Sequence, residues 1–220
     1  IVALTKFNYN SFDLTTAASK GLAFNSSANG FETSSAGAMT LIKTLTASSD
    51  STLSFVHGSS DVVLDSTYPV YMFKFINMHP ATNSKNFAVN FRDGGSNYDA
   101  TKTSSFFKTF HTESDSATNL LYEDGSDLAQ STGIQHLTEQ VGNGSDESCS
   151  GTLYLFNPSS TTFVKHFIGS ANCYYTDGIT VNTFFSGYCN VTAAIDGAQF
   201  SFVSGNIDAG TIKLYGIKDS

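Results

Sequence analysis

Short alternating segments, each closed by a turn, are the feature that most constrains how this chain can fold. After residue 38, apolar residues recur at every second position in short runs bounded by Ser, Asn, Asp and Gly. The predicted strands are 40–47, 52–57, 69–77, 86–92, 151–157, 161–169, 181–190, 198–205 and 211–217. Residues 105–112 suit either a strand or a short helix. Because no long helix and no 20–50-residue repeat is present, the pattern predicts an all-β, jelly-roll-like antiparallel sandwich.

Composition supports strands and turns and disfavours one class of partner. The chain has 220 residues with a formal net charge of −8, and its 13% aromatic residues are all Phe and Tyr. An acidic surface repels phosphate backbones, so we expect no nucleic-acid partner. Without a run of eighteen apolar residues or a charged-then-apolar leader, the sequence predicts neither membrane insertion nor a signal peptide.

Two parts of the chain are predicted. Residues 1–37 contain apolar clusters without a sustained period, which indicates an irregular N-terminal arm or attachment segment. Residues 38–220 form the predicted sandwich domain. Within it, 113–149 is expected to form long loops, with one or two helical turns at 134–141.

The strand positions also predict neighbours. The segments 40–47 and 52–57 suggest a hairpin, and 69–77 is apolar on both sides, which is typical of a central strand. The last strand is expected to place Ile212 and Leu214 in the core beside Phe200 and Phe202. It would complete a sheet and leave that edge free for a second copy.

The three cysteines, Cys149, Cys173 and Cys189, form neither an even framework nor a CxxC pair. We expect free thiols, as in a chain folded in a reducing cytoplasm, with a Cys173–Cys189 bridge as the alternative.

Residues suited to catalysis or metal binding are scattered. His111 and Glu113 would share a face if 105–112 is a strand, and His166 could join them as ligands of a divalent metal. The histidine pair typical of cupins is missing, so strand-end histidines without a special role are the simpler interpretation. The acidic turns are oxygen-rich enough for calcium, yet the same residues form turns for local backbone reasons. These turn residues are Asp93, Asn97, Asp99, Glu123, Asp124 and Asp127. We therefore expect no cofactor, no metal and no catalytic residue.

One aromatic pair is a candidate contact. Tyr174 and Tyr175 could stack on a glycan, or they could lie in a contact between subunits, where tyrosine is enriched. The subunit contact is the favoured interpretation.

Several long segments resemble a known group of proteins. "LFNPSSTTFVKHFIG" and "SGNIDAGTIKLYGIKDS" are similar to segments of virion structural proteins of tailed bacteriophages, especially those of marine and cyanobacterial hosts. "YMFKFINMHPAT", "DGGSNYDATKT" and "GSDLAQSTG" extend the resemblance over about residues 39–220. The segment "FNYNSFDLT" looks like the short attachment segments of fibre or decoration proteins.

The resemblance implies a non-enzymatic virion component, assembled in the host cytoplasm. It would decorate the capsid or form a head or tail fibre by self-assembly, as a homo-oligomer, with a trimer expected. Its partners would be capsid or tail proteins. The alternatives are a receptor-binding tip of a tail fibre that recognises a host-surface glycan, and a cupin-like metal-binding protein.

Overall fold

The computed structural model describes residues 20–24, 27, 30–35, 37–176 and 178–218, and these contain strands and no helix. The described residues divide near residue 40 into two compact units, with β3 crossing the division. In the first unit β1 (Lys20–Phe24) and β2 (Phe31–Ser35) form an antiparallel hairpin. The predicted irregular arm therefore contains a regular element. The segment "FNYNSFDLT" lies outside the described residues.

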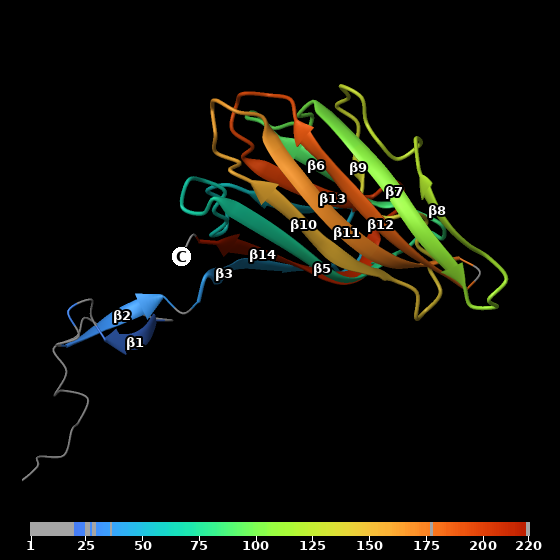
Figure 1. Cartoon of the computed structure of the whole chain (residues 1–220), viewed down its shortest axis with the longest axis horizontal. Coiled ribbons are helices and arrows are strands. Elements are labelled where there is room, and N and C mark those ends of the chain that lie inside the picture. The colour runs from blue at the N-terminus through green and yellow to red at the C-terminus, as the bar shows by residue number, and fades with distance from the viewer. Residues whose placement is uncertain (1–19, 25–26, 28–29, 36, 177, 219–220) are drawn as a thin grey trace, which may run out of the picture. The chain divides into compact units, whose positions relative to one another are not determined.

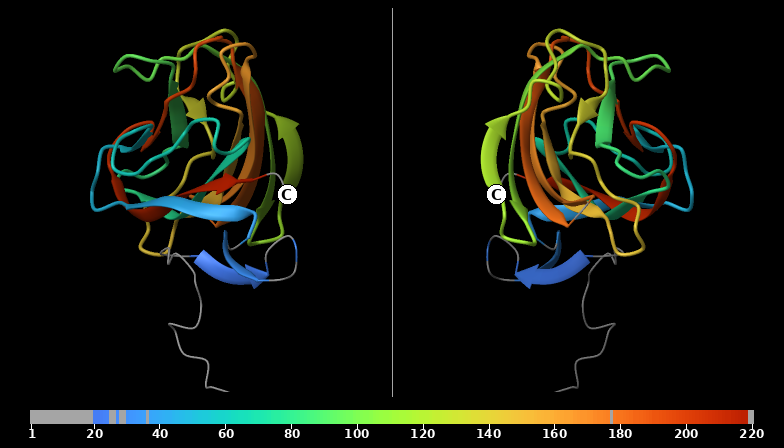
Figure 2. Two further views of the ribbon diagram at one scale, coloured as in Figure 1. Left: turned by 90° about the vertical axis from the view of Figure 1, so that its left-hand side faces the viewer. Right: turned by 90° about the vertical axis from the view of Figure 1, so that its right-hand side faces the viewer.

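The second unit consists of two antiparallel sheets packed face to face, as the sequence predicted (Figures 1 and 2). The large sheet has the order β3 (Met39–Thr46), β14 (Ile207–Ile217), β5 (Val70–Pro80), β10 (Cys149–Phe156), β11 (Lys165–Tyr175), β12 (Ile179–Cys189), β7 (Lys102–Thr112), β8 (Thr118–Tyr122). The small sheet has the order β4 (Leu53–Val56), β13 (Gly197–Phe202), β6 (Phe87–Arg92), β9 (Gln135–His136). In the described part of the chain, no helix is long and apolar enough to cross a membrane.

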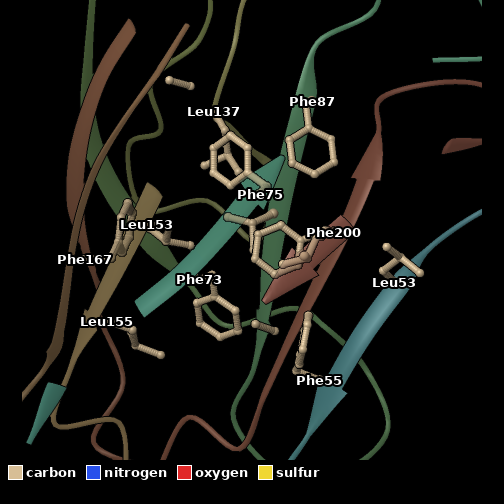
Figure 3. Close-up of a cluster of buried hydrophobic side chains, with 14 of the residues drawn as sticks. Leu53, Phe55, Phe73, Phe75, Phe87, Leu137, Leu153, Leu155, Phe167 and Phe200 are labelled. Atoms are coloured by element: carbon tan, nitrogen blue, oxygen red, sulfur yellow. The ribbon is translucent and has the colours of Figure 1, made fainter. Parts of the chain in front are cut away.

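Phenylalanine rings from both sheets form the core (Figure 3). Phe73 and Phe75 of β5 meet Phe200 and Phe87 of the small sheet at centroid distances of 5.2 and 5.3 Å. All four side chains are fully buried. Burying each such side chain contributes about 2–3 kcal/mol, so these alternating positions determine which face of each sheet points inward.

Strand neighbours differ from the expectations in two places. The strands β3 and β4 belong to different sheets, so 40–47 and 52–57 do not form a hairpin. The last strand, β14, is not an edge strand, because it lies between β3 and β5. Ile212 and Leu214 are nevertheless fully buried, as expected. The central position of β5, between β14 and β10, is confirmed.

The segment 113–149 contains extended chain rather than helical turns. It forms β8 and the short β9, and Leu137 and Val141 are fully buried. The backbone N–H groups of these two residues donate to Phe87 O at 2.8 Å and Lys85 O at 2.9 Å. Pairing with β6 and the residues just before it supplies the hydrogen bonds that a helix would have formed locally, so the helical interpretation of 134–141 was wrong.

Candidate contact surface

The outer face of the large sheet carries exposed aromatic and aliphatic side chains. Outward positions on β10, β11, β12, β7 and β8 alternate with the buried positions, as the strand period requires. The large apolar side chains there that are 37–64% exposed, called the apolar face below, are Phe156, Ile168, Phe184, Phe107, Leu120 and Tyr122. Figure 1 looks onto these strands, with the small sheet behind them.

Cross-strand register places these side chains beside one another. Phe184 lies directly opposite Phe107, and their rings stack at a centroid distance of 5.0 Å and an interplanar angle of 14°. On the other side of β7, Tyr122 of β8 lies directly opposite Phe107. Tyr154 is opposite Ile168 on the neighbouring pair of strands. Phe184, Phe107 and Tyr122 thus form one row across β12, β7 and β8, and Tyr154 and Ile168 lie in the next outward row, on β10 and β11.

Two shallow hollows lie on the apolar face, of about 320 and 410 Å³. Rings of Tyr154, Phe184 and Phe107 border the first, and Ile168 is shared with the second. Hydroxyl groups of Ser170, Thr152 and Ser186 contribute polar atoms to the first. The surface therefore offers shallow apolar contact area with a few hydrogen-bonding groups.

Five described strands are neighbours in the large sheet: β10, β11, β12, β7 and β8. None of their outward positions holds Asp, Glu, Lys or Arg, although the chain as a whole has a net charge of −8. Lys108, on β7, points inward instead. Its ammonium group lies 2.6 Å from Glu123 and 3.2 Å from Glu139. The ionic groups of these strands are thus directed away from the apolar face.

The two tyrosines singled out from the sequence lie on opposite sides of β11, since they are consecutive residues of a strand. The hydroxyl of Tyr175 donates to Gln140 Oε1 at 3.2 Å, and its ring packs against the core. Tyr174 points to the outer side, in the row of Thr180 and His111. The pair does not form a two-ring platform, and only Tyr174 is on the outer side of the sheet.

The structure does not bring the candidate metal ligands together. His111 of β7 lies directly opposite Thr180 of β12, whereas His166 of β11 lies directly opposite Tyr188 of β12. Thr180 and Tyr188 are separated by eight residues of β12, or about 26 Å. His111 pairs with Asp115 at 3.0 Å, and the backbone N–H of Glu113 donates to Gly178 O. Among the described residues, no group of three His, Cys, Asp or Glu side chains could hold an ion.

The acidic turns are engaged locally. Glu123 pairs with Lys108, and Asp127 accepts a hydrogen bond from the hydroxyl of Tyr122. In the turn that contains Asp93, the backbone N–H of Gly94 donates to Asp196, which also forms a bidentate pair with Arg92. These contacts support the interpretation of the residues as turn and framework groups.

The cysteines lie in the structure as free thiols, all three buried. The alternative Cys173–Cys189 bridge was wrong. Cys173 is opposite Val181 and Cys189 is opposite Lys165, so the two residues lie at opposite ends of the β11–β12 pair.

Sequence reasoning missed the apolar face, although a signal was present. Two strands contain adjacent phenylalanines, Phe106-Phe107 and Phe184-Phe185. Because successive side chains on a strand point to opposite faces, such a pair must place one ring outward. The inward rings, Phe106 and Phe185, are buried at 0% and 2% exposure.

Comparison of the chain with protein-family models, with curated proteins and with solved structures finds no match.

Proposed function

We propose that this chain is a non-enzymatic structural protein of a tailed-phage virion, which assembles with copies of itself through the apolar face. The observation that carries the proposal is the exposure of six large apolar side chains on one sheet surface, where no outward strand position from β10 across to β8 holds Asp, Glu, Lys or Arg. Solvent exposure of a contiguous apolar surface is unfavourable, and such surfaces are typical of protein contacts. The phage assignment rests on the sequence resemblance over residues 39–220.

A second copy of the chain is the occupant that the charges favour. Two chains that each carry −8 repel one another, and the repulsion is smallest where they meet through strands whose outward positions hold no Asp or Glu. Aromatic side chains, with charged groups depleted, are typical of the centre of such an interface. A trimer is the expected assembly, with capsid or tail proteins as further partners.

Light scattering coupled to size exclusion tests the self-assembly, with the full chain over a micromolar concentration series. We expect an oligomer of the 23.5 kDa chain. Phe184→Asp should dissociate it, because the charge would be buried in the contact without a partner. Phe163→Asp is the matched control: Phe163 is 70% exposed in the loop between β10 and β11, outside the apolar face. A monomeric wild-type chain, or equal effects of the two substitutions, would contradict the proposal.

The virion assignment has its own test. Imaging of intact particles at subnanometre resolution should place density of this sandwich on the capsid or the tail. Particles without such density would refute the virion role, whatever the oligomeric state of the purified chain.

A glycan-binding tip of a fibre is the second candidate, and the hollow bordered by Tyr154, Phe184 and Phe107 favours it. Aromatic rings beside hydroxyl groups can stack on a sugar and hydrogen-bond to it. A glycan array measures this directly. Binding that is lost in Tyr154→Ala and retained in Tyr174→Ala would locate the glycan in this hollow. Absence of binding to host-surface glycans would remove the candidate.

A further inference from the structure

Cys149 and Cys173 lie directly opposite each other on the neighbouring strands β10 and β11. Both side chains point inward and are 1% exposed. The backbone N–H of Tyr174 donates to Ser148 O at 3.0 Å, and this bond flanks the cysteine pair. In an antiparallel ladder, a pair flanked in this way is a non-hydrogen-bonded pair, the arrangement in which facing residues are closest.

The geometry of such a pair fits a disulfide. The Cα atoms of facing non-hydrogen-bonded residues are about 4.5 Å apart, and disulfides span Cα separations of about 4.4–6.8 Å. Cys189 has no comparable neighbour, because Lys165 and Lys102 lie opposite it on the two adjacent strands. Register therefore selects one pair out of three thiols.

We propose that Cys149 and Cys173 form a cross-strand disulfide when the chain meets an oxidising thiol–disulfide environment, while Cys189 stays reduced. With oxidised glutathione as the oxidant, one cysteine thiolate attacks a glutathione sulfur, and glutathione thiolate leaves. The second cysteine thiolate then attacks the protein sulfur of this mixed disulfide, and a second glutathione thiolate leaves. Two protein thiols lose two electrons and two protons, and one oxidised glutathione becomes two reduced ones.

The position of the bond gives it a structural consequence. The connection between β10 and β11 is at residues 157–164, so the cysteine pair lies at the open end of this hairpin. A disulfide there closes a ring that contains the hairpin and holds the end of β11 beside the start of β10. The backbone N–H of Gly142 donates to Tyr174 O at 3.1 Å. By fixing the end of β11, the disulfide would therefore also fix the position of the loop that precedes β10.

Burial governs how fast the pair reacts. It raises the pKa of Cys173 to about 12 and the pKa of Cys149 well above its ordinary value. Thiolates are the reactive species, so exchange in the closed fold is slow and proceeds when the open end of the hairpin separates. The disulfide is therefore suited to a lasting change of redox environment rather than to rapid switching. The proposal does not depend on the virion role.

Mass spectrometry after controlled oxidation tests it. The folded full chain is incubated in glutathione buffers from fully reduced to fully oxidised, unfolded in urea with an alkylating agent, and digested. We expect a linked Cys149–Cys173 peptide pair and alkylated Cys189 in the oxidised samples, with the intact mass lower by two hydrogen atoms. Cys189→Ala should oxidise in the same way, whereas Cys149→Ala should retain its thiols.

Three results would overturn the proposal: three alkylated cysteines after full oxidation, a linked peptide that contains Cys189, or glutathione adducts in place of the internal bond. If Cys149→Ala fails to fold, the peptide map of the wild-type chain alone decides, because it identifies the bonded residues directly.

Discussion

Three glycines of the large sheet make room for three buried phenylalanine rings, and adding one methyl group tests this packing. Gly169 lies directly opposite Phe185, Gly187 opposite Phe167, and Gly151 opposite Phe75. The first two pairs are reciprocal between β11 and β12, since each strand contributes one glycine and one ring. Each ring covers the space where a side chain of the facing residue would lie.

The magnitude for Gly169→Ala follows from the distances. An ideal Cβ at residue 169 would lie 2.3 Å from Thr152 O and 2.5 Å from two ring carbons of Phe185. Ordinary contacts of a Cβ begin near 3.4 Å, so both neighbours must move by about 1 Å. Rotation of the ring cannot relieve the contact with the main-chain oxygen, so the ladder between β10 and β11 must distort. We expect a loss of about 3 kcal/mol in the free energy of unfolding.

Chemical denaturation measures this loss against Gly125→Ala, which is the same substitution with room for the methyl group. The nearest atom to a Cβ at residue 125 is Glu123 Oε1 at 3.7 Å, so the control should change stability by less than about 0.5 kcal/mol. For a chain of this length, 3 kcal/mol lowers Tm by about 6–12 °C. A Gly169→Ala protein as stable as the control would refute the packing argument.

Three further predictions concern charges. Burial lowers the pKa of Lys102 from 10.5 to about 8, so between these pH values the unfolded chain holds a proton that the folded chain has released. Wild type should therefore gain stability relative to Lys102→Met as pH rises through this window, by about 3 kcal/mol at most, in denaturation at several pH values. Lys108→Met should lower the free energy of unfolding by about 2–3 kcal/mol, because Glu139 is 7% exposed and loses its counter-charge. Adding Glu139→Gln to this variant should restore part of the lost stability in the same denaturation assay. Association through the apolar face should strengthen as salt rises to about 0.5 M in light scattering, since salt screens repulsion between acidic copies; weakening by salt would instead indicate an interface of ion pairs.

Alternation in the sequence predicts which side of a strand is buried, and it predicts little about which strands are neighbours. Ile212 and Leu214 are in the core because their spacing and apolar character suffice for that inference. The position of β14 between β3 and β5 depends on contacts with residues more than a hundred positions away, which no local pattern contains. The predicted 40–47/52–57 hairpin was wrong for the same reason.

Local periodicity was misleading where long-range pairing overrides it. Ile134, Leu137 and Val141 have a spacing that also suits a helix, the element expected at 134–141. In the fold, Leu137 and Val141 bond to the backbone of Phe87 and Lys85 and are fully buried. The predicted grouping of the metal ligands was wrong for a related reason. The strand period indicates that His111 and Glu113 share a face, but it does not indicate how far along the neighbouring strands His166 lies.

The adjacent phenylalanines connect the interior of the sandwich with its proposed contact. In β12, Phe185 fills the space over Gly169, and its neighbour Phe184 must then point outward and stack on Phe107. A strand that needed only its core could carry Ser or Thr at residue 184, as at Ser186 and Thr180 of the same strand. The outward ring is partly covered by Phe107, and 37% of it stays exposed in the described fold. The proposed contact with a second copy would cover the part of this ring that Phe107 leaves exposed, and Phe184→Asp should remove that contact while Phe185 keeps its place in the core.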